Sequence, residues 1–252
     1  MPELNENQVY NRVVRLTGNA AFQRLRQSRV AVFGLGGVGS WCVEALARTG
    51  IGRLTLIDAD VVAASNINRQ LPALQTTVGQ SKVDVLRRRI AEIDPTIEVE
   101  VREMRYSPET AAELPLEGYD YVVDAIDSVR DKAHLILTAC RARVPLVSSM
   151  GAALRIDPTR VKVATDFQKV TGDALAAALR RRFRKLDEMP RRKFACVWSD
   201  EPRRVNVVDC YEDLSGAMSF NKVVVNGALC QVTAAFGMAL ASVVINKLAG
   251  LK

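Results

Sequence analysis

Short apolar runs rich in β-branched residues alternate with amphipathic segments along the first 150 residues of the chain. Strands interleaved with helices indicate a parallel sheet with right-handed crossover connections. The pattern therefore predicts an α/β fold with helices on both faces of a mostly parallel sheet. The predicted strands are 29–34, 53–58, 97–101, 119–125 and 144–148, and the predicted helices are 38–49, 80–93 and 128–143.

The alternation ends at Gly151, and the remaining residues have a mixed pattern. Ile156-Asp-Pro-Thr predicts a turn between two short strands within 154–163, and 171–186 has helical spacing. Pro190 and Pro202 favour a loop over 187–204. We expect a single domain over 1–252, in which 8–150 forms one half and 151–252 a mixed extension that ends in a long apolar helix over 226–248.

The long apolar helix contains no charged residue between positions 227 and 245, which is close to the length that spans a bilayer. Gln231, Thr233 and Ser242 dilute it, together with small alanine and glycine residues. We therefore expect a buried helix or a dimer-interface helix. Peripheral membrane contact is the less favoured alternative.

A glycine-rich turn follows the first predicted strand, with Gly34, Gly36 and Gly39 in the spacing G-x-G-x-x-G and Gly37 between them. Such a turn lets the backbone approach a phosphate, and the next helix supplies N–H donors at its positive end. Asp58 ends the second strand, where a carboxylate binds ribose hydroxyls. These features predict a Rossmann-like nucleotide site, and no G-x-x-x-x-G-K-[ST] motif indicates a P-loop.

Beyond Asp58, the chain carries a carboxylate, amides and cations in close succession. A dinucleotide has no evident need for this set, whereas a triphosphate needs cations to clamp its charge and a metal needs carboxylates. We therefore expect ATP with Mg²⁺ rather than NAD. The residues expected to bind it here are Asp60, Asn66, Arg69, Gln70 and Lys82.

Asp127 and Ser128 follow the fourth predicted strand and face the same edge of the sheet. We interpret Asp127 as the magnesium or pyrophosphate-side residue and Ser128 as part of the nucleotide site. A second interpretation, compatible with the first, is that Asp127 is the N-cap of the helix before Val129.

Lysine and arginine total 35 against 28 acidic residues, a net charge of +7. Most of the excess lies in one segment, which indicates either a surface for a phosphate-rich partner or a solvated helix face, and charge alone does not choose between them. Its basic residues are Arg180, Arg181, Arg182, Arg184, Lys185, Arg191, Arg192 and Lys193.

The chemistry of cysteine and histidine is limited in this chain. Its cysteines, five in number and without a C-x-x-C pair, argue against a disulfide framework and a zinc site. The first residues resemble no secretion signal, so a cytoplasmic location is expected. The single histidine, His134, lies in a helical pattern, which disfavours Ser-His-Asp and Cys-His hydrolases.

Taken together, these motifs resemble the ubiquitin-activating-enzyme-like family of adenylating proteins. The matching motifs are Gly34-x-Gly-Gly-Val-Gly-Ser, Asp58-x-Asp, Asn66-x-x-Arg-Gln, Gly79-x-x-Lys and Asp124-x-x-Asp, and the likeness covers about residues 8–165. It implies an ATP-binding half at 8–150, a substrate-binding and dimerisation half at 151–252, and a homodimer. It also implies that Arg12 reaches the neighbouring subunit's triphosphate, so that Arg12, Arg69, Lys82 and Asp127 are the catalytic set.

Further segments resemble the branch of this family that modifies tRNA, among them Glu44–Gly52, Asp124–Arg130 and Thr233–Gly237. This likeness implies ATP-dependent cyclisation of a threonylcarbamoyl group on a tRNA adenosine through an acyl-adenylate. The basic segment then suits the tRNA backbone. Sulfur-relay or cysteine-desulfurase partners are also implied by the family.

The chain departs from the family at a cysteine-containing stretch, where it has Lys222-Val-Val-Val-Asn-Gly instead. Cys196 resembles another family cysteine and has either a chemical role or a buried, structural one. Two further functions stay open: activation of a small sulfur-carrier protein and binding of NAD by a redox module.

Overall fold

The computed structural model describes residues 6–207 and 226–251. The helices are α1 (Glu6–Val9), α2 (Asn11–Thr17), α3 (Asn19–Gln27), α4 (Gly39–Thr49), α5 (Lys82–Ile93), α6 (Val129–Ala142), α7 (Ala174–Lys185) and α8 (Cys230–Ala249). The strands are β1 (Arg29–Phe33), β2 (Arg53–Ile57), β3 (Glu98–Arg102), β4 (Tyr121–Asp124), β5 (Leu146–Ser149), β6 (Val161–Ala164) and β7 (Ala195–Ser199).

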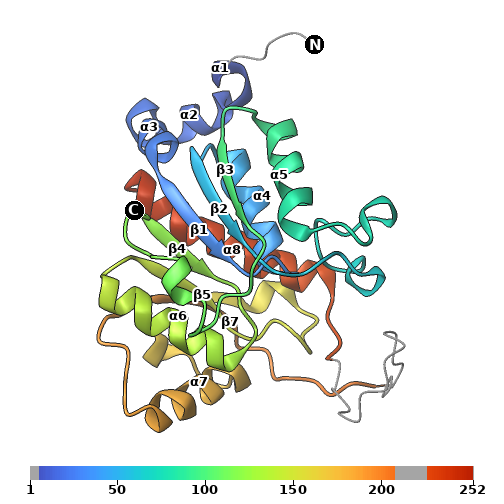
Figure 1. The fold of residues 1–252 in the computed structure, drawn as a ribbon, viewed down its shortest axis with the longest axis vertical. Coiled ribbons are helices and arrows are strands. Elements are labelled where there is room, and N and C mark those ends of the chain that lie inside the picture. Colours follow the sequence, from blue (N-terminus) through green and yellow to red (C-terminus); the bar gives the residue numbers. More distant parts are fainter. Residues whose placement is uncertain (1–5, 208–225, 252) are drawn as a thin grey trace.

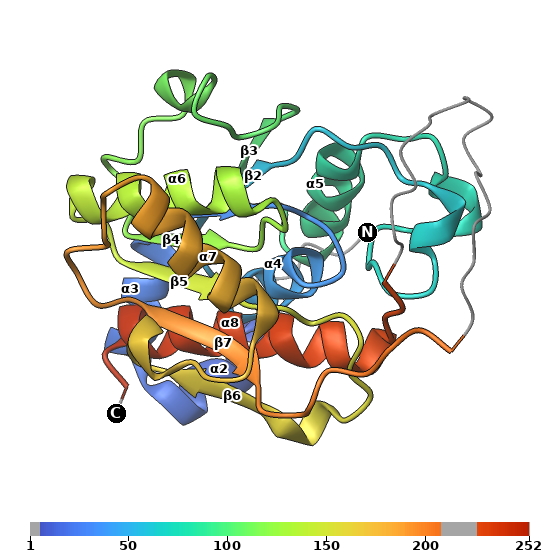
Figure 2. The ribbon, with the colours of Figure 1, turned by 90° about the horizontal axis from the view of Figure 1, so that it is seen from below.

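Within the described residues, the strands form one seven-stranded sheet in the order β3-β2-β1-β4-β5-β7-β6. Neighbours from β3 to β7 run parallel, and only β6 is antiparallel to its neighbour β7. Helices cover both faces (Figures 1 and 2). One apolar core packs α3, α4, α5 and α8 against the sheet, and a second packs α6 and α7 against its other face. The predicted α/β, Rossmann-like class is confirmed.

The central strands are buried along nearly their whole length, because helices cover both of their faces. The register of the strands places their carboxyl ends side by side. Phe33 pairs with Ile57 on one side and with Asp124 on the other, and Asp124 pairs with Ser148. The segments that follow β1, β2, β4 and β5 therefore meet at one edge, which is where ligands bind in such sheets.

The strands and helices predicted before residue 150 all form, with ends shifted by a few residues. The three amino-terminal helices were not anticipated. Tyr10 explains how they attach: it is buried, and its hydroxyl donates to Asp94 Oδ2 at 2.7 Å. This contact holds the start of α2 at the end of the sheet opposite the glycine-rich turn, since Asp94 follows α5 and precedes β3.

The prediction of a loop over 187–204 is wrong, because Ala195–Ser199 forms β7. This strand inserts between β5 and β6, and its last four residues are buried. The strand is only five residues long, which is too short to show a clear hydrophobic period. It also lies between loop-favouring residues, with Pro190 and arginines before it and Pro202 after it. Tertiary contact with β5 therefore decides its structure.

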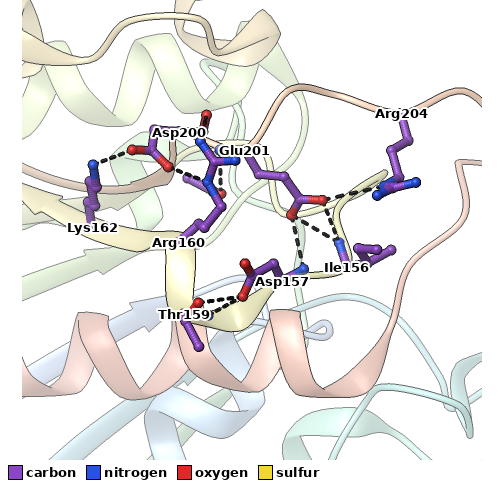
Figure 3. A network of polar contacts seen from close by, with 9 residues as sticks. Ile156, Asp157, Thr159, Arg160, Lys162, Asp200, Glu201 and Arg204 are labelled. Carbon is purple, nitrogen blue, oxygen red and sulfur yellow. Dashed lines mark hydrogen bonds and ion pairs between the residues drawn. The ribbon is translucent and has the colours of Figure 1, made fainter.

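The prediction of two strands within 154–163 is also wrong, because only Val161–Ala164 is a strand. Asp157 instead caps a short 3₁₀ turn, and a carboxylate from beyond β7 binds the backbone (Figure 3). Glu201 accepts N–H hydrogen bonds from Ile156 and Asp157, each at 3.0 Å, and pairs with Arg204. Since Glu201 takes these donors, the segment has no strand partner for them.

The long apolar helix begins at Cys230, four residues later than predicted, and packs as a core helix. A Cβ atom on Gly237 would lie 2.5 Å from the carbonyl oxygen of Val38, so only glycine allows α8 to approach α4 this closely. By length and mean hydropathy of 1.6, α8 is the one described helix that could cross a membrane. One face of α8 is buried against α4 and the sheet, whereas Met238 and Ser242 on its other face are exposed, so the dimer-interface alternative stays a prediction.

Candidate functional site

A cavity of about 650 Å³ opens at the carboxyl edge of the sheet. The glycine-rich turn, the segments after β2, β3, β4 and β5, and the start of α8 line it. Gly34, Gly36, Gly37, Asp58, Asp60, Arg69, Gln70, Lys82, Asp127 and Ser128 all lie in this lining. The fold thus brings most of the sequence-predicted nucleotide-site residues together from the stretches 34–37, 58–60, 69–70 and 127–128 and from Lys82.

The glycines of the turn have two different tasks. Gly34 has a φ of +86°, and a Cβ there would lie 2.8 Å from the carbonyl oxygen of Ala125, so the close contact between the turn and the segment after β4 requires glycine. A Cβ on Gly39 would overlap the carbonyl oxygen of Gly34, and Gly39 does not line the cavity. Gly39 therefore lets the turn fold, and Gly36 and Gly37 line the cavity.

Asp58 ties the turn to the end of β2. Its Oδ2 accepts the Leu35 N–H at 2.6 Å, and its Oδ1 accepts the Asp60 N–H at 2.8 Å. The carboxylate is partly exposed and lines the cavity. A carboxylate oriented by two backbone donors is well placed to accept ribose hydroxyls.

Two of the predicted phosphate-binding cations, Arg69 and Lys82, line the cavity. Lys82 Nζ lies 2.7 Å from Asp60 Oδ2, with the lysine side chain 4% exposed and the aspartate side chain 70% exposed. The Arg69 guanidinium donates to Asn68 Oδ1 at 2.9 Å, and its carbonyl accepts the Trp41 Nε1–H. Both cations are thus held in position before any nucleotide binds.

Gln70 lies beside them and has a polar atom left over. Its side chain is 8% exposed, and its Oε1 has no hydrogen-bond partner among the described residues. Such an orphaned acceptor is costly unless a ligand pairs with it. The glycine cradle, the cations and this acceptor fit a nucleoside triphosphate.

Besides Gly39, the predicted residues Asn66 and Arg12 do not reach the cavity of their own chain. Asn66 accepts the Ala63 N–H at 3.1 Å and closes a 3₁₀ turn, so its side chain shapes the loop instead of facing the pocket. Arg12 is exposed on α2, near the opposite end of the sheet. Its predicted contact therefore requires a neighbouring subunit.

The segment after β4 divides its tasks between two residues. Ser128 caps α6, since its side chain accepts from the Asp131 N–H. The interpretation that Asp127 caps this helix is therefore wrong, and Asp127 stays exposed in the cavity lining. No group of three or more His, Cys, Asp or Glu in the described ranges forms a self-contained metal site. One exposed carboxylate beside a triphosphate fits Mg²⁺, which binds phosphates and keeps several waters.

Sequence reasoning missed a buried network beneath the cavity. Lys132 and Asp124 are both fully buried, with Nζ 2.8 Å from Oδ2, and Ser148 donates to the same oxygen at 2.6 Å. Asp124 Oδ1 also accepts the Ile126 N–H at 3.1 Å, which shapes the loop before Asp127. The sequence did contain a sign of this network. Lys132 lies on the apolar face of α6, four residues before Ile136, where a charged side chain needs a buried partner.

Arg105 and Asp131 also line the cavity and were not predicted. Cys196, by contrast, lies in β7 outside the lining, and burial raises its pKa far above the ordinary range. A buried neutral thiol is a poor nucleophile, so the structural alternative holds. His134 also lies outside the lining, with Nδ1 3.0 Å from the Tyr106 hydroxyl.

The basic segment begins beside the cavity and leads away from it. Leu175, in the first turn of α7, lines the cavity, and the cations follow along that helix and after it. Arg180 donates to the carbonyls of Phe167 and Val170, so its guanidinium is engaged internally. Arg182 is half-buried, and the exposed cations are Arg181, Arg184, Lys185, Arg191, Arg192 and Lys193.

The sequence pattern of the ThiF family matches residues 10–252. The chain belongs to the ThiF family. It is 40% identical over 249 residues to tRNA threonylcarbamoyladenosine dehydratase of Haemophilus influenzae, covering 97% of this chain and 94% of the relative. The dehydratase of the same name from Bacillus subtilis is 45% identical over 184 residues, 73% of this chain and 71% of its own.

A solved structure shares the whole fold of this ThiF-family chain. The crystal structure of Escherichia coli tRNA N6-threonylcarbamoyladenosine dehydratase in complex with ATP superposes with a TM-score of 0.84 at 39% identity. The match covers 97% of this chain and 95% of that one. The family resemblance predicted from the motifs is confirmed, and ATP is the nucleotide in this similar structure.

Proposed function

We propose that this ThiF-family chain is an ATP-dependent, ligase-type tRNA threonylcarbamoyladenosine dehydratase that works in the cytoplasm. One observation carries the proposal: a glycine cradle, the Asp58 carboxylate and the Arg69 and Lys82 cations converge on one cavity. The names of relatives that match over nearly the whole chain support the tRNA substrate. The reaction removes one water from the modified adenosine by closing a ring.

The first step joins two anions. The threonylcarbamoyl carboxylate is ionised at neutral pH, so it needs no base to attack the α-phosphorus of ATP. Pyrophosphate leaves, and an acyl-adenylate forms. Arg69 and Lys82 stabilise the charge that develops on the phosphates, which is their main contribution to the rate. Mg²⁺, held by Asp127 and the phosphates, would add to this stabilisation.

The second step closes the ring. The carbamoyl group of the same side chain attacks the activated carbonyl carbon, expels AMP and releases one proton to solvent. Because both groups belong to one side chain held in the cavity, proximity lowers the barrier. Asp58 holds the ribose of the nucleotide, and the backbone of Gly36 and Gly37 approaches the phosphates.

The proposal includes a homodimer. Arg12 lies on an exposed helix at the far end of the sheet, so only the Arg12 of a second subunit would complete the phosphate clamp. Mixing an inactive Arg69→Ala chain with an inactive Arg12→Ala chain tests this. Restored turnover in the mixed dimer supports the shared site, and no restoration contradicts it.

The exposed cations of α7 and the loop after it form the proposed tRNA surface. This surface starts at the cavity wall, so a tRNA bound along it would deliver its modified adenosine to the site. Arg180 is excluded because its guanidinium is internally engaged. Binding to such a surface weakens steeply with salt.

The deciding experiment incubates the protein with MgATP and unfractionated tRNA and analyses the nucleosides by mass spectrometry. We expect loss of one water from threonylcarbamoyladenosine, dependent on ATP and strongly slowed by Arg69→Ala. Thermal stabilisation by NAD but not by MgATP would contradict the proposal. Pyrophosphate exchange that needs a small carrier protein, with no effect of tRNA, would indicate the sulfur-carrier activity instead.

A further inference from the structure

One wall of the cavity carries a charged pair that the proposed mechanism does not use, Arg105 and Asp131. We infer that the Arg105 guanidinium contacts the nucleobase of the bound ATP, and that Asp131 is the residue that positions it. The inference rests on the proposed ATP site and adds a residue that determines nucleotide recognition.

The pair joins an exposed cation to a buried anion. Arg105 Nε and Nη2 lie 2.9 Å and 2.6 Å from Asp131 Oδ2, and the side chains are 69% and 1% exposed. Asp131 stands in the first turn of α6, where the helix dipole favours a carboxylate. Both Arg105 contacts go to Asp131 Oδ2, while Oδ1 is buried with no partner among the described residues.

The backbone of Arg105 is fixed from both sides. Thr110 Oγ1 donates to the Arg105 carbonyl at 2.7 Å. The next residue, Tyr106, is buried, packs edge-on against Phe33 with ring centroids 5.1 Å apart, and contacts His134. The guanidinium is therefore positioned before the nucleotide arrives, which reduces the entropy lost on binding.

The order of strands places this wall relative to the nucleotide. The glycine-rich turn follows β1, Asp58 follows β2, and Arg105 follows β3, and these three strands are successive neighbours in the sheet. With phosphates at the turn and ribose at Asp58, the nucleotide continues in the same direction towards Arg105. From the segment after β3, the Arg105 side chain reaches Asp131 on α6, which follows β4, so the pair spans the cavity wall that a base bound beyond Asp58 would meet.

The chemistry of the guanidinium suits this role. Its planar face stacks on aromatic rings, whereas an ammonium group does so less well. A base contact is made equally in the ground state and the transition state, so its loss raises KM without lowering kcat. For Arg105→Ala we expect KM for ATP to rise about 3- to 30-fold, the range of cation–π contacts.

The test separates base from phosphate recognition. Binding of AMP and of inorganic tripolyphosphate, which has no base, is measured by calorimetry for the wild-type protein, Arg105→Ala and Arg105→Lys. We expect Arg105→Ala to weaken the binding of AMP and to leave the affinity for tripolyphosphate unchanged. Arg105→Lys should restore AMP binding only in part. Arg102→Ala is the matched control, since Arg102 is a half-exposed cation at the end of β3 outside the cavity lining.

Steady-state kinetics complete the test. Arg105→Ala and Asp131→Asn should raise KM for ATP with kcat and KM for tRNA unchanged, and thermal unfolding confirms that each variant folds. An equal loss of tripolyphosphate binding, or a change in KM for tRNA instead of ATP, would overturn the inference. If the wild-type protein itself fails to bind ATP, the proposed function fails; if it binds ATP and Arg105→Ala binds equally well, only this inference fails.

Discussion

Ion pairs of the same chemistry serve different purposes in the two halves of the molecule. Beneath the cavity, Lys132 and Asp124 are both 0% exposed. At the β6–β7 edge, Lys162 and Asp200 also pair, but their side chains are 54% and 28% exposed (Figure 3). A buried pair is costly to break because one charge is left without water or a partner, whereas an exposed pair contributes little. Burial, more than residue type, decides what each pair does.

The largest effect expected from this comparison is on stability. Lys132→Met leaves the Asp124 carboxylate buried without its cation, so the free energy of unfolding should fall by about 3–5 kcal/mol. Lys162→Met, its control at the exposed edge, should change stability by less than about 1 kcal/mol. Denaturant unfolding of both variants measures the difference, and equal losses would contradict the role given to burial.

The next effect concerns turnover. Arg69→Ala should lower kcat on the order of 100-fold, since it removes a donor to charge that develops in the transition state. Arg69 is only partly buried, so the melting temperature should stay close to that of the wild-type protein. Arg87→Ala, an exposed cation on α5 outside the cavity, is the control. Normal turnover in Arg69→Ala would remove the phosphate clamp from the mechanism.

A smaller effect on stability is expected for Glu201, which follows β7 at the β6–β7 edge of the sheet. Burial opposes ionisation of this carboxyl, but the Asp157 and Ile156 N–H donors and Arg204 outweigh it, so the pKa of Glu201 is lowered. Its contribution to stability is therefore present above the unfolded-state pKa and is lost as pH falls through the folded value. Glu201→Gln should cost roughly 1–3 kcal/mol at neutral pH.

Urea unfolding of wild-type protein and Glu201→Gln at pH 7 and at pH 3 tests this assignment. The difference in the free energy of unfolding between the two proteins should be smaller at pH 3, because protonation removes the same charge that the substitution removes. If this difference does not change with pH, the ionised carboxylate of Glu201 is not the form that binds the backbone of residues 156–157.

The smallest effect is expected for the exposed cations of α7. Replacing Arg181, Arg184 and Lys185 by glutamine should flatten the dependence of tRNA affinity on salt by about 2 units of log–log slope. Folding and ATP binding should not change, since all three side chains point to solvent. An unchanged slope by filter binding over a salt series would place the tRNA surface elsewhere on the molecule.

The same comparison explains how far sequence reasoning reached. From β1 to β5, strands such as Val30–Phe33 are apolar runs flanked by amphipathic helices, so hydrophobic periodicity and turn residues predicted each of these strands and α-helices. The three amino-terminal helices were not predicted. In the second half, β7 is five residues long and lies among prolines and arginines, and its partner β5 is distant in the chain. Its structure depends on a neighbour that local patterns do not contain.

The candidate site divides in the same way. Gly36, Asp58, Arg69 and Lys82 belong to short motifs, so the sequence alone located them. Asn66 belongs to the same motif as Arg69. Its side chain nevertheless accepts a hydrogen bond from the Ala63 N–H and does not line the cavity. Residues outside such motifs, which line or support the cavity only through tertiary contacts, were missed.

The sequence by itself determined the alternating architecture, the glycine-rich nucleotide turn and the family, because periodicity and motif spacing are local properties of the chain. Only the tertiary structure decided that Arg105 meets Asp131, that Lys132 neutralises a buried Asp124, and that Arg180 is withdrawn from the basic surface. Each of these depends on which side chains become neighbours once water is excluded. The energy of a charge is set by those neighbours and not by its place in the sequence.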